Sequence, residues 1–442
     1  MSGISEIVDF GTNQVFAGPQ NYVAILILQR ATAPQKIVIT RYDRTGLDAA
    51  EIALELNAAY PKPGVVRFAL APSALGVDSE WKLFDTAQAG LSSRCFEDFP
   101  AFREIIAFAS EGIHSGKDEV FFIPKDQASR LQLESPPVYP LAKGKDIHRY
   151  ESADTKTFAN TVIYPYDLRT GDVMSPEQLE SDAPKIWKHL CDSSSLLRGR
   201  SYFDKSSKAW YELWCQRDPS LYILPKIVGP EIANKGEFTI SSKPLFINNK
   251  LKAIVLKPDV NEALHFVLGL LNSRLVTYLH RHIAPPKGNN YFEVKTRILE
   301  RLPIRRIDPN NKADQAAHDR IVSLVEKMLS LHRQRAAAKT PHEQTALDRQ
   351  IGATDALIDR EVYALYGLTP EEIALVEGSA MPEEETEVPA AAPALASMLD
   401  ATLEYPHKAG YRGHMVFREE PVEYTAARQS SPPTTHPEKA AP

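Results

Sequence analysis

Cationic and aromatic side chains crowd one short stretch of the sequence, PLAKGKDIHRY. It holds Lys143, Lys145, His148 and Arg149, and Tyr150 ends it. A cation every two or three residues beside an aromatic ring suits contact with the phosphates of a nucleic-acid backbone. On the residues alone, a solvated turn is the plain alternative.

A second set of such side chains lies around the loop IAPPKGNNYF. Arg274 lies on the preceding helix, and Lys287, Asn289, Asn290 and Tyr291 lie in the loop. Pro and Gly exclude regular structure there, so the side chains can reach outward. Amide groups pair with the edge of adenine in the major groove, which makes the two asparagines candidate base readers. A left-handed turn conformation would explain both asparagines equally well.

Weaker candidates come from other turns. Lys226 precedes an apolar strand, and the next loop has the tip Asn-Lys-Gly at residues 234–236, which is usually a simple turn but could enter a major groove. In the glycine-containing turn at residues 112–116, Ser115 and the following Lys117 could approach a phosphate. Such glycines more often serve only to permit positive φ.

The segment Leu251 to Ile304 supplies a framework for these groups. LKAIVL at Leu251 to Leu256 is a β-branched run followed by a turn signal, which predicts a strand. From Glu262 to Leu279 apolar residues recur at helical spacing and predict one helix, and a second strand follows. Upstream, Phe99 to Ile123 predicts a helix, a Gly-rich turn and an apolar strand.

Further elements are expected between these segments. LPKIVGPEIANKGEFTI predicts a strand, a loop and a strand, and residues 242–249 are expected to continue that sheet into LKAIVL. WYELWCQRD places Trp210, Leu213 and Trp214 at helical spacing, which is more typical of a core than of a stacking site.

The N-terminal part predicts a sheet. EIVDFG, YVAILIL, KIVITRYD and VVRFALAP read as strands, and Asp48 to Ala59 reads as an amphipathic helix. The first two strands look like a β-hairpin at the start of the chain.

The C-terminal part predicts helices and then a tail. Residues 314–335 and 345–366 are amphipathic and predict an antiparallel helical hairpin, and Thr369 opens a short third helix with a capping box. Residues 379–442 contain nine prolines, ten acidic and five basic residues, which predicts a disordered acidic tail.

Composition sets the broad class. The chain has 442 residues, 43% of them hydrophobic and 24% charged, which is ordinary for a soluble protein of two or three domains. Three scattered cysteines support neither a disulfide framework nor a zinc ribbon, and they fit a reducing cytoplasm. We expect no membrane span and no targeting segment.

Charge is distributed unevenly. Residues 140–306 contain 26 Lys and Arg against 18 Asp and Glu, a net charge of +8, whereas the whole chain carries −6. A basic face is the usual footprint of a domain that binds a duplex, although a solvated surface could also carry this charge.

Four stretches of the sequence together resemble the C-terminal specificity domain of TaqI-like adenine methyltransferases and of type IIG restriction-modification enzymes. They are, in chain order, PLAKGKDIHRY, LPKIVGPEI, LGLLNSRLVTYLH and YFEVKTRILERLPI. The resemblance implies an α+β fold in four parts: the last strands of a methyltransferase α/β fold at 1–95, a mixed α/β DNA specificity domain at 96–310, a helical hairpin at 311–378 and the disordered acidic tail at 379–442.

The resemblance also implies a function. This chain would recognise a short sequence in double-stranded DNA, as the specificity subunit or C-terminal half of a restriction-modification system. We find neither the F-x-G-x-G loop that binds S-adenosylmethionine nor the N-P-P-Y motif that holds the exocyclic amine. We therefore expect no catalytic, cofactor-binding or metal-binding residues in this chain.

Two alternatives stay open. The chain could be one half of a split adenine-specific methyltransferase or restriction enzyme, active only with a catalytic partner chain that binds S-adenosylmethionine. It could also be a degenerate helical adaptor whose DNA-binding face is lost.

Overall fold

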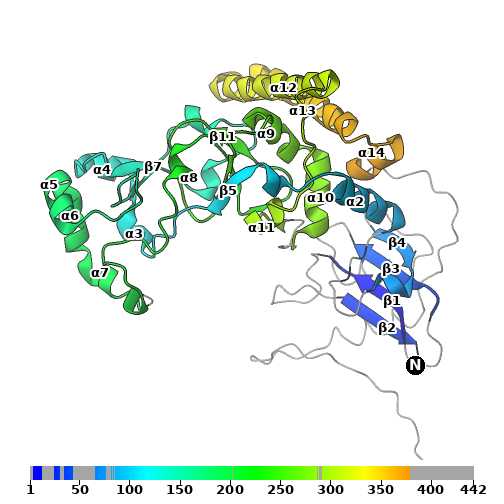
Figure 1. Cartoon of the computed structure of the whole chain (residues 1–442), viewed down its shortest axis with the longest axis horizontal. Coiled ribbons are helices and arrows are strands. Elements are labelled where there is room, and N and C mark those ends of the chain that lie inside the picture. The colour runs from blue at the N-terminus through cyan, green and yellow to red at the C-terminus, as the bar shows by residue number, and fades with distance from the viewer. Residues whose placement is uncertain are drawn as a thin grey trace, which may run out of the picture. The chain divides into compact units, whose positions relative to one another are not determined.

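The computed structural model describes residues 3–11, 24–29, 34–42, 65–75, 81, 83, 85–201, 203–285, 287 and 291–378. The fold is α+β, as predicted (Figure 1). The helix expected at 48–59, the candidate base readers Asn289 and Asn290, and the tail at 379–442 lie outside the described residues. Within them, no helix is long and apolar enough to cross a membrane.

The N-terminal part forms a sheet with the strand order β2-β1-β3-β4. Its strands are β1 (Gly3–Asp9), β2 (Ala24–Gln29), β3 (Ile37–Tyr42) and β4 (Val65–Leu70). β1 pairs antiparallel with β2 and parallel with β3. Alternate apolar side chains such as Ile7, Ile39 and Phe68 bury one face. The four predicted strands are confirmed. At the edge, Leu26 and Leu28 of β2 are 43% and 54% exposed.

A second sheet has the order β11-β9-β13-β5, with all neighbours antiparallel. Its strands are β5 (Ile106–Glu111), β9 (Lys226–Pro230), β11 (Thr239–Ser241) and β13 (Leu251–Leu256). The predicted strand β13 is confirmed, and it lies between two cores: Ile254 packs into one, and Leu251 and Ala253 pack into the other. Burial on both faces explains its nearly continuous apolar sequence.

The helix expected after Phe99 is wrong. Residues 106–111 form β5 instead, because they pair with β13 from Ile106 opposite Leu256 to Glu111 opposite Lys252. At the end of β5, the Glu111 carboxylate accepts hydrogen bonds from Lys252 (3.0 Å) and Arg217 (2.6 Å).

A third sheet has the order β12-β7-β8-β6. Its strands are β6 (Phe122–Pro124), β7 (Val138–Ala142), β8 (Asn160–Ile163) and β12 (Phe246–Ile247). Residues 242–249 do not continue the second sheet as expected, since β12 pairs in parallel with β7. Phe246 stacks on Tyr139 and on Tyr222, with ring centroids 4.6 and 4.3 Å away.

Short helices share the core of this third sheet. They are α3 (Asp118–Phe121), α4 (Lys125–Arg130), α5 (Pro176–Asp182), α6 (Pro184–Asp192), α7 (Ser194–Arg198) and α8 (Ser220–Ile223). Leu179, Ile186, Leu190 and Leu197 are the apolar residues that α5, α6 and α7 bury in it.

An irregular segment follows α7 and is held by one buried cation. Arg200 is 3% exposed, and its guanidinium donates to the backbone carbonyls of Leu197, Trp210, Glu212 and Ser115. Trp210, Leu213 and Trp214 therefore do not lie on a helix, despite their spacing. The carbonyls of Trp210 and Glu212 accept from Arg200 rather than from helical N–H groups.

A helical layer packs on the other face of the second sheet. Its helices are α2 (Thr86–Asp98), α9 (Leu264–Asn272), α10 (Arg274–Ile283), α11 (Thr296–Leu299), α12 (Lys312–Ala337), α13 (Pro341–Leu365) and α14 (Pro370–Glu377). The short pair β10 (Ile232–Ala233) and β14 (Phe292–Glu293) lies beside α10. The boundary expected between residues 95 and 96 falls inside α2.

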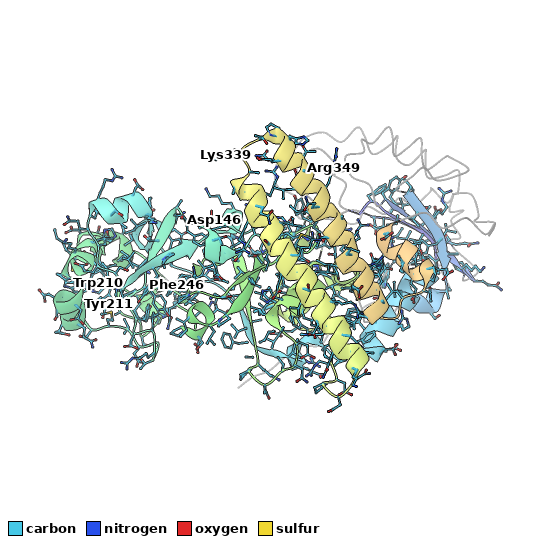
Figure 2. All side chains as sticks on the ribbon, turned by 90° about the horizontal axis from the view of Figure 1, so that it is seen from above. Asp146, Trp210, Tyr211, Phe246, Lys339 and Arg349 are labelled. Atoms are coloured by element: carbon cyan, nitrogen blue, oxygen red, sulfur yellow. The ribbon has the colours of Figure 1, made fainter. Side chains whose placement is uncertain are left out.

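The predicted helical hairpin is present as α12 and α13, joined at Lys339 (Figure 2). α12 packs closely on α9 at Gly269, where an added Cβ would lie 2.8 Å from a methyl carbon of Ile321. The single helix expected from Glu262 to Leu279 is broken at Ser273. That residue has extended backbone angles, and its hydroxyl caps α10 by accepting from the N–H of Val276.

Candidate nucleic-acid interface

The predicted basic turn, residues 143–150, follows β7 in the chain and begins with a short 3-10 helix, Gly144–Asp146. The N–H of Lys143 donates to the Asp146 carboxylate at 2.8 Å, which fixes the turn. Lys145 and His148 point their side chains into solvent and are exposed. Lys143 is partly buried, with its ammonium 5.6 Å from the ring centroid of Phe122.

The other two residues of this segment face inward. Tyr150 has no exposed surface, and the side chain of Arg149 is 17% exposed. Arg149 makes two hydrogen bonds to the Asp355 carboxylate of α13, at 2.6 and 2.8 Å. This placement corrects the expectation for Tyr150, because a side chain without accessible surface cannot touch a base or a phosphate.

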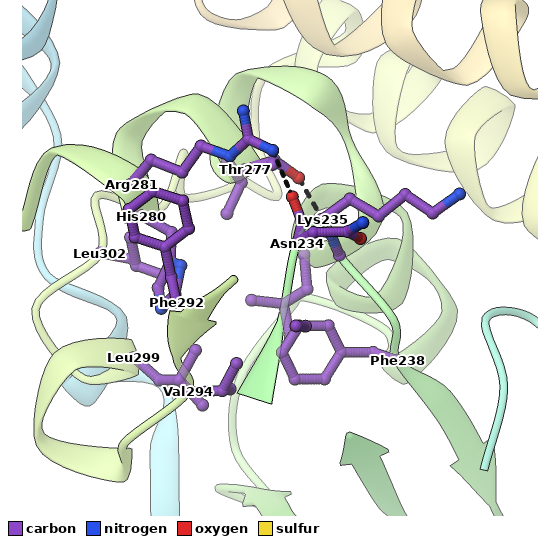
Figure 3. Close-up of a pocket in the computed structure, with 14 residues that line it drawn as sticks. Asn234, Lys235, Phe238, Thr277, His280, Arg281, Phe292, Val294, Leu299 and Leu302 are labelled. Atoms are coloured by element: carbon purple, nitrogen blue, oxygen red, sulfur yellow. Dashed lines mark hydrogen bonds between the residues drawn. The ribbon is translucent and has the colours of Figure 1, made fainter. Parts of the chain in front are cut away.

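The loop at residues 234–238 lies next to the basic turn. Both are attached to Asn272, the last residue of α9: its side chain bonds the N–H and the C=O of Phe238, each at 2.9 Å, and its carbonyl accepts from Arg149. The N–H of Tyr150 also donates to the Phe238 carbonyl. At the tip, Lys235 is exposed and points away from the pocket (Figure 3).

The end of α10 closes the other side of this loop. Arg281 donates to the Asn234 carbonyl and lies 5.5 Å from the ring centroid of Phe292 (Figure 3). Burial lowers the pKa of the adjacent His280 to about 4, so the cation here at neutral pH is Arg281. The recess between these groups has about 20 Å³ of space, which holds roughly one water molecule.

The loop after α10 carries further exposed groups. Lys287 is half exposed and forms an ion pair with Glu293 at 2.7 Å, and Lys295 pairs with the same carboxylate. Burial raises the pKa of Glu293, but the two lysines outweigh it and hold the pKa below its usual value. Tyr291 is 42% exposed.

The remaining predicted contacts are engaged within the protein. Lys226 is 0% exposed, and its ammonium donates to the carbonyls of Tyr222 and Leu224. Burial lowers its pKa to about 8. Direct contact with DNA does not fit this burial, which corrects the expectation for Lys226. The side chain of Arg274 is 57% exposed and pairs with Asp359.

The weaker phosphate candidates are also tied down. Ser115 is 1% exposed and donates to Asp118, and Lys117 pairs with Glu119 at 3.0 Å. Gly116 has a φ of 77°, which supports the turn interpretation.

Five exposed side chains of basic residues thus lie on the basic turn, on the 234–238 loop, at the end of α10 and in the loop after it. We call them the basic rim: Lys145, His148, Lys235, Arg281 and Lys287. In the sequence, Lys235 is a candidate only as part of the Asn-Lys-Gly tip, which is usually a simple turn, and Arg281 is not a candidate. The position of Arg281 depends on its bond to a carbonyl 47 residues earlier. In the described part of the chain, no cluster of His, Cys, Asp or Glu could hold a metal ion.

The segments that carry the rim match the model of a known domain family. Residues 139–304 match the TaqI-like C-terminal specificity domain. The matched range, which we call the specificity domain, includes the whole basic rim, helices α5 to α11, and the second and third sheets except β5, β6 and the first residue of β7.

Curated relatives are type II methyltransferases. M.HindII of Haemophilus influenzae is 25% identical over 228 residues, which is 50% of this chain and 41% of the relative. M.BanIII of Aneurinibacillus aneurinilyticus is 28% identical over 147 residues, which is 33% of this chain and 24% of the relative. The chain therefore spans less than half the length of these relatives.

A solved structure is similar at low identity. It is the type IIG restriction endonuclease BpuSI, with a TM-score of 0.40 and 11% identity, covering 83% of this chain and 44% of that one.

Proposed function

We propose that this chain binds double-stranded DNA and reads a short sequence in it, as the specificity part of a restriction-modification system. The observation that carries the proposal is the match of residues 139–304 to a specificity domain. The basic rim supports it, because exposed cations on connected segments provide the phosphate contacts that dominate affinity for DNA.

Within this proposal the side chains divide by role. Lys145, His148 and Lys235 contact phosphates and position the protein, which requires hydrogen-bond donors but carries no sequence information. Asn289 and Asn290 read base edges, since an amide can pair with both N6 and N7 of adenine. Tyr291 lies next to them in the sequence and is exposed.

Binding to a labelled duplex, measured by fluorescence anisotropy at several salt concentrations, tests the phosphate contacts. Lys145→Ala should weaken binding to every sequence and reduce the salt slope by about one. Lys188→Ala is the matched control, because this lysine is 74% exposed on α6, away from the rim. Equal effects of the two substitutions would contradict a role for the rim.

Selection of bound oligonucleotides tests base reading. Asn290→Ala should relax the selected sequence at one position, since one amide contact contributes roughly 1–3 kcal/mol of discrimination. Its binding to non-specific DNA should stay close to that of the unaltered protein. An unchanged selected sequence would remove Asn290 from the readers, and no selected sequence for either protein would favour the adaptor alternative.

A second candidate is a share in methyl transfer with a catalytic partner chain that binds S-adenosylmethionine. It is favoured by β2, which lies at the edge of the sheet among the described strands and whose Leu26 and Leu28 are partly exposed large apolar side chains. An apolar edge strand is a site where a strand of another chain can add. Its partner, on this proposal, is a methyltransferase core.

Tritiated-methyl transfer to plasmid DNA tests this candidate. We expect transfer only when a separately expressed methyltransferase core is added to this chain, and we expect the combined change Leu26→Lys with Leu28→Lys to abolish it. Leu131→Lys is the control, at a leucine that is 46% exposed after α4. Transfer by this chain alone would contradict the partner requirement.

A further inference from the structure

Helix α13 directs two carboxylates at the specificity domain. Asp355 accepts from both terminal nitrogens of Arg149, at 2.6 and 2.8 Å. One turn further along, Asp359 accepts from the backbone N–H of Arg274 at 2.8 Å, at the first residue of α10. Residues four apart lie on the same side of a helix, so the two carboxylates act on neighbouring points.

The Arg149 guanidinium joins three separate segments. Besides Asp355 it donates to the carbonyl of Asn272 at 2.8 Å, and it lies 4.8 Å from the ring centroid of Tyr150. Asn272 in turn holds the backbone of Phe238. One side chain therefore fixes the basic turn, the end of α9 and, through Asn272, the loop that carries Lys235.

The ion pair is mostly buried. The side chains of Arg149 and Asp355 are 17% and 28% exposed. Arg149 could reach a phosphate only by leaving a bidentate carboxylate that already matches the fork of its guanidinium. Leaving it would also strand Asp355 without a partner in a poorly solvated place, which is costly.

We propose that Asp355 and Asp359 are positioning residues for DNA binding. Asp355, through Arg149 as a strut, holds the basic turn and the 234–238 loop so that Lys145, His148 and Lys235 face outward, and Asp359 holds the start of α10 beside them. The inference rests on the proposed DNA binding. In this inference Arg149 supports the interface without contacting DNA, and the helical hairpin is needed for binding because α13 carries both aspartates.

The direction in which Asp355→Ala changes DNA affinity shows whether Arg149 is a strut or a phosphate contact. If Arg149 is a strut, Asp355→Ala weakens binding to a labelled duplex, on the order of tenfold, as expected for a coupled network. The double variant Arg149→Ala with Asp355→Ala should then bind no more weakly than either single variant. If Arg149 contacts a phosphate, Asp355→Ala releases the cation, removes a negative charge and tightens binding instead, which overturns the inference.

Exchanging the two charges gives a second readout. Arg149→Asp combined with Asp355→Arg can rebuild the ion pair and should bring affinity back to within a few-fold of the unaltered chain. A phosphate contact would make this variant the weakest binder of the set, because it presents a carboxylate to DNA.

The control is Asp348→Ala, which removes the same charge from the same helix. Asp348 pairs with Arg335 of α12 at 2.8 Å, both side chains being well exposed, and its loss should leave affinity nearly unchanged. Circular dichroism verifies folding, and Asp355→Asn replaces Asp355→Ala if the alanine variant unfolds. An Asp355 variant that binds like Asp348→Ala overturns the inference alone, whereas an unaltered chain that binds no duplex overturns the proposed function.

Discussion

Gly269 is the point at which the helical hairpin approaches the specificity domain most tightly among the glycines described. A Cβ added there would lie 2.8 Å from Cγ2 of Ile321 and 3.0 Å from Cγ2 of Val325, both on α12. Real Cβ atoms essentially never come as close as the first of these distances, so α9 and α12 must separate or Ile321 must shift. Overpacking of this kind typically costs about 1–3 kcal/mol.

Gly269→Ala also removes a glycine from a helix, which stabilises by about 0.5–1 kcal/mol and would mask part of the cost. Gly352→Ala on α13 corrects for this, because nothing lies within 4 Å of an added Cβ there. Gly352→Ala should therefore stabilise by about 0.5–1 kcal/mol, and the difference between the two variants should equal the steric cost of about 1–3 kcal/mol.

The assay is urea unfolding followed by far-ultraviolet circular dichroism, with the slope of the transition checked for each variant. Ile321→Leu keeps the side-chain volume but removes the Cγ2 methyl that an added Cβ would meet. Combining it with Gly269→Ala should therefore recover part of the lost stability. Stabilisation by Gly269→Ala equal to that by Gly352→Ala would refute the reasoning and show that the hairpin does not press on α9.

Three further predictions concern buried polar groups. Burial lowers the pKa of Lys226 to about 8, so between pH 8 and 10.5 this side chain is protonated in the unfolded chain and deprotonated in the folded one. The free energy of unfolding should therefore rise with pH across this window. A Lys226→Met variant should not show the corresponding rise in thermal midpoint. Burial raises the pKa of Glu111, but hydrogen bonds from Lys252 and His114 outweigh this effect and lower the pKa to about 2. The stability that the Glu111 carboxylate contributes is therefore complete above pH 4.5 and is lost as pH falls through 2. Glu111→Gln should make the free energy of unfolding depend less on pH on the acid side. Asn272→Ala should cost about 1–3 kcal/mol in urea unfolding, because it leaves the N–H of Phe238 unsatisfied, whereas the Phe238 carbonyl keeps its hydrogen bond from the N–H of Tyr150; a loss below 1 kcal/mol would mean that water replaces the amide.

The sequence predicted elements whose pattern is set locally. β13 was evident because both of its faces are buried, and the long helices α12 and α13 because one face of each is apolar. β5 was missed, since IIAFASE acquires its strand conformation from β13, more than 140 residues later. The break at Ser273 was missed because the apolar spacing continues across it.

The interface was predictable to a similar extent. A run of cations marked the right turn, and the exposure of Lys145 and His148 agrees with it. The same run could not separate those two from Arg149, because the carboxylate that binds Arg149 lies 206 residues further along. Which cation faces solvent is a tertiary property, and the local sequence does not encode it.

Arg200 shows how such a domain can vary in sequence. Four of its hydrogen bonds go to backbone carbonyls, those of Leu197, Trp210, Glu212 and Ser115. Every residue type offers the same carbonyl, so the neighbours of Arg200 can be exchanged without removing a single one of these hydrogen bonds. The irregular segment between α7 and α8 is therefore free to diversify its outward side chains over evolution, while one arginine, which lysine cannot replace for lack of a fork of donors, preserves its path.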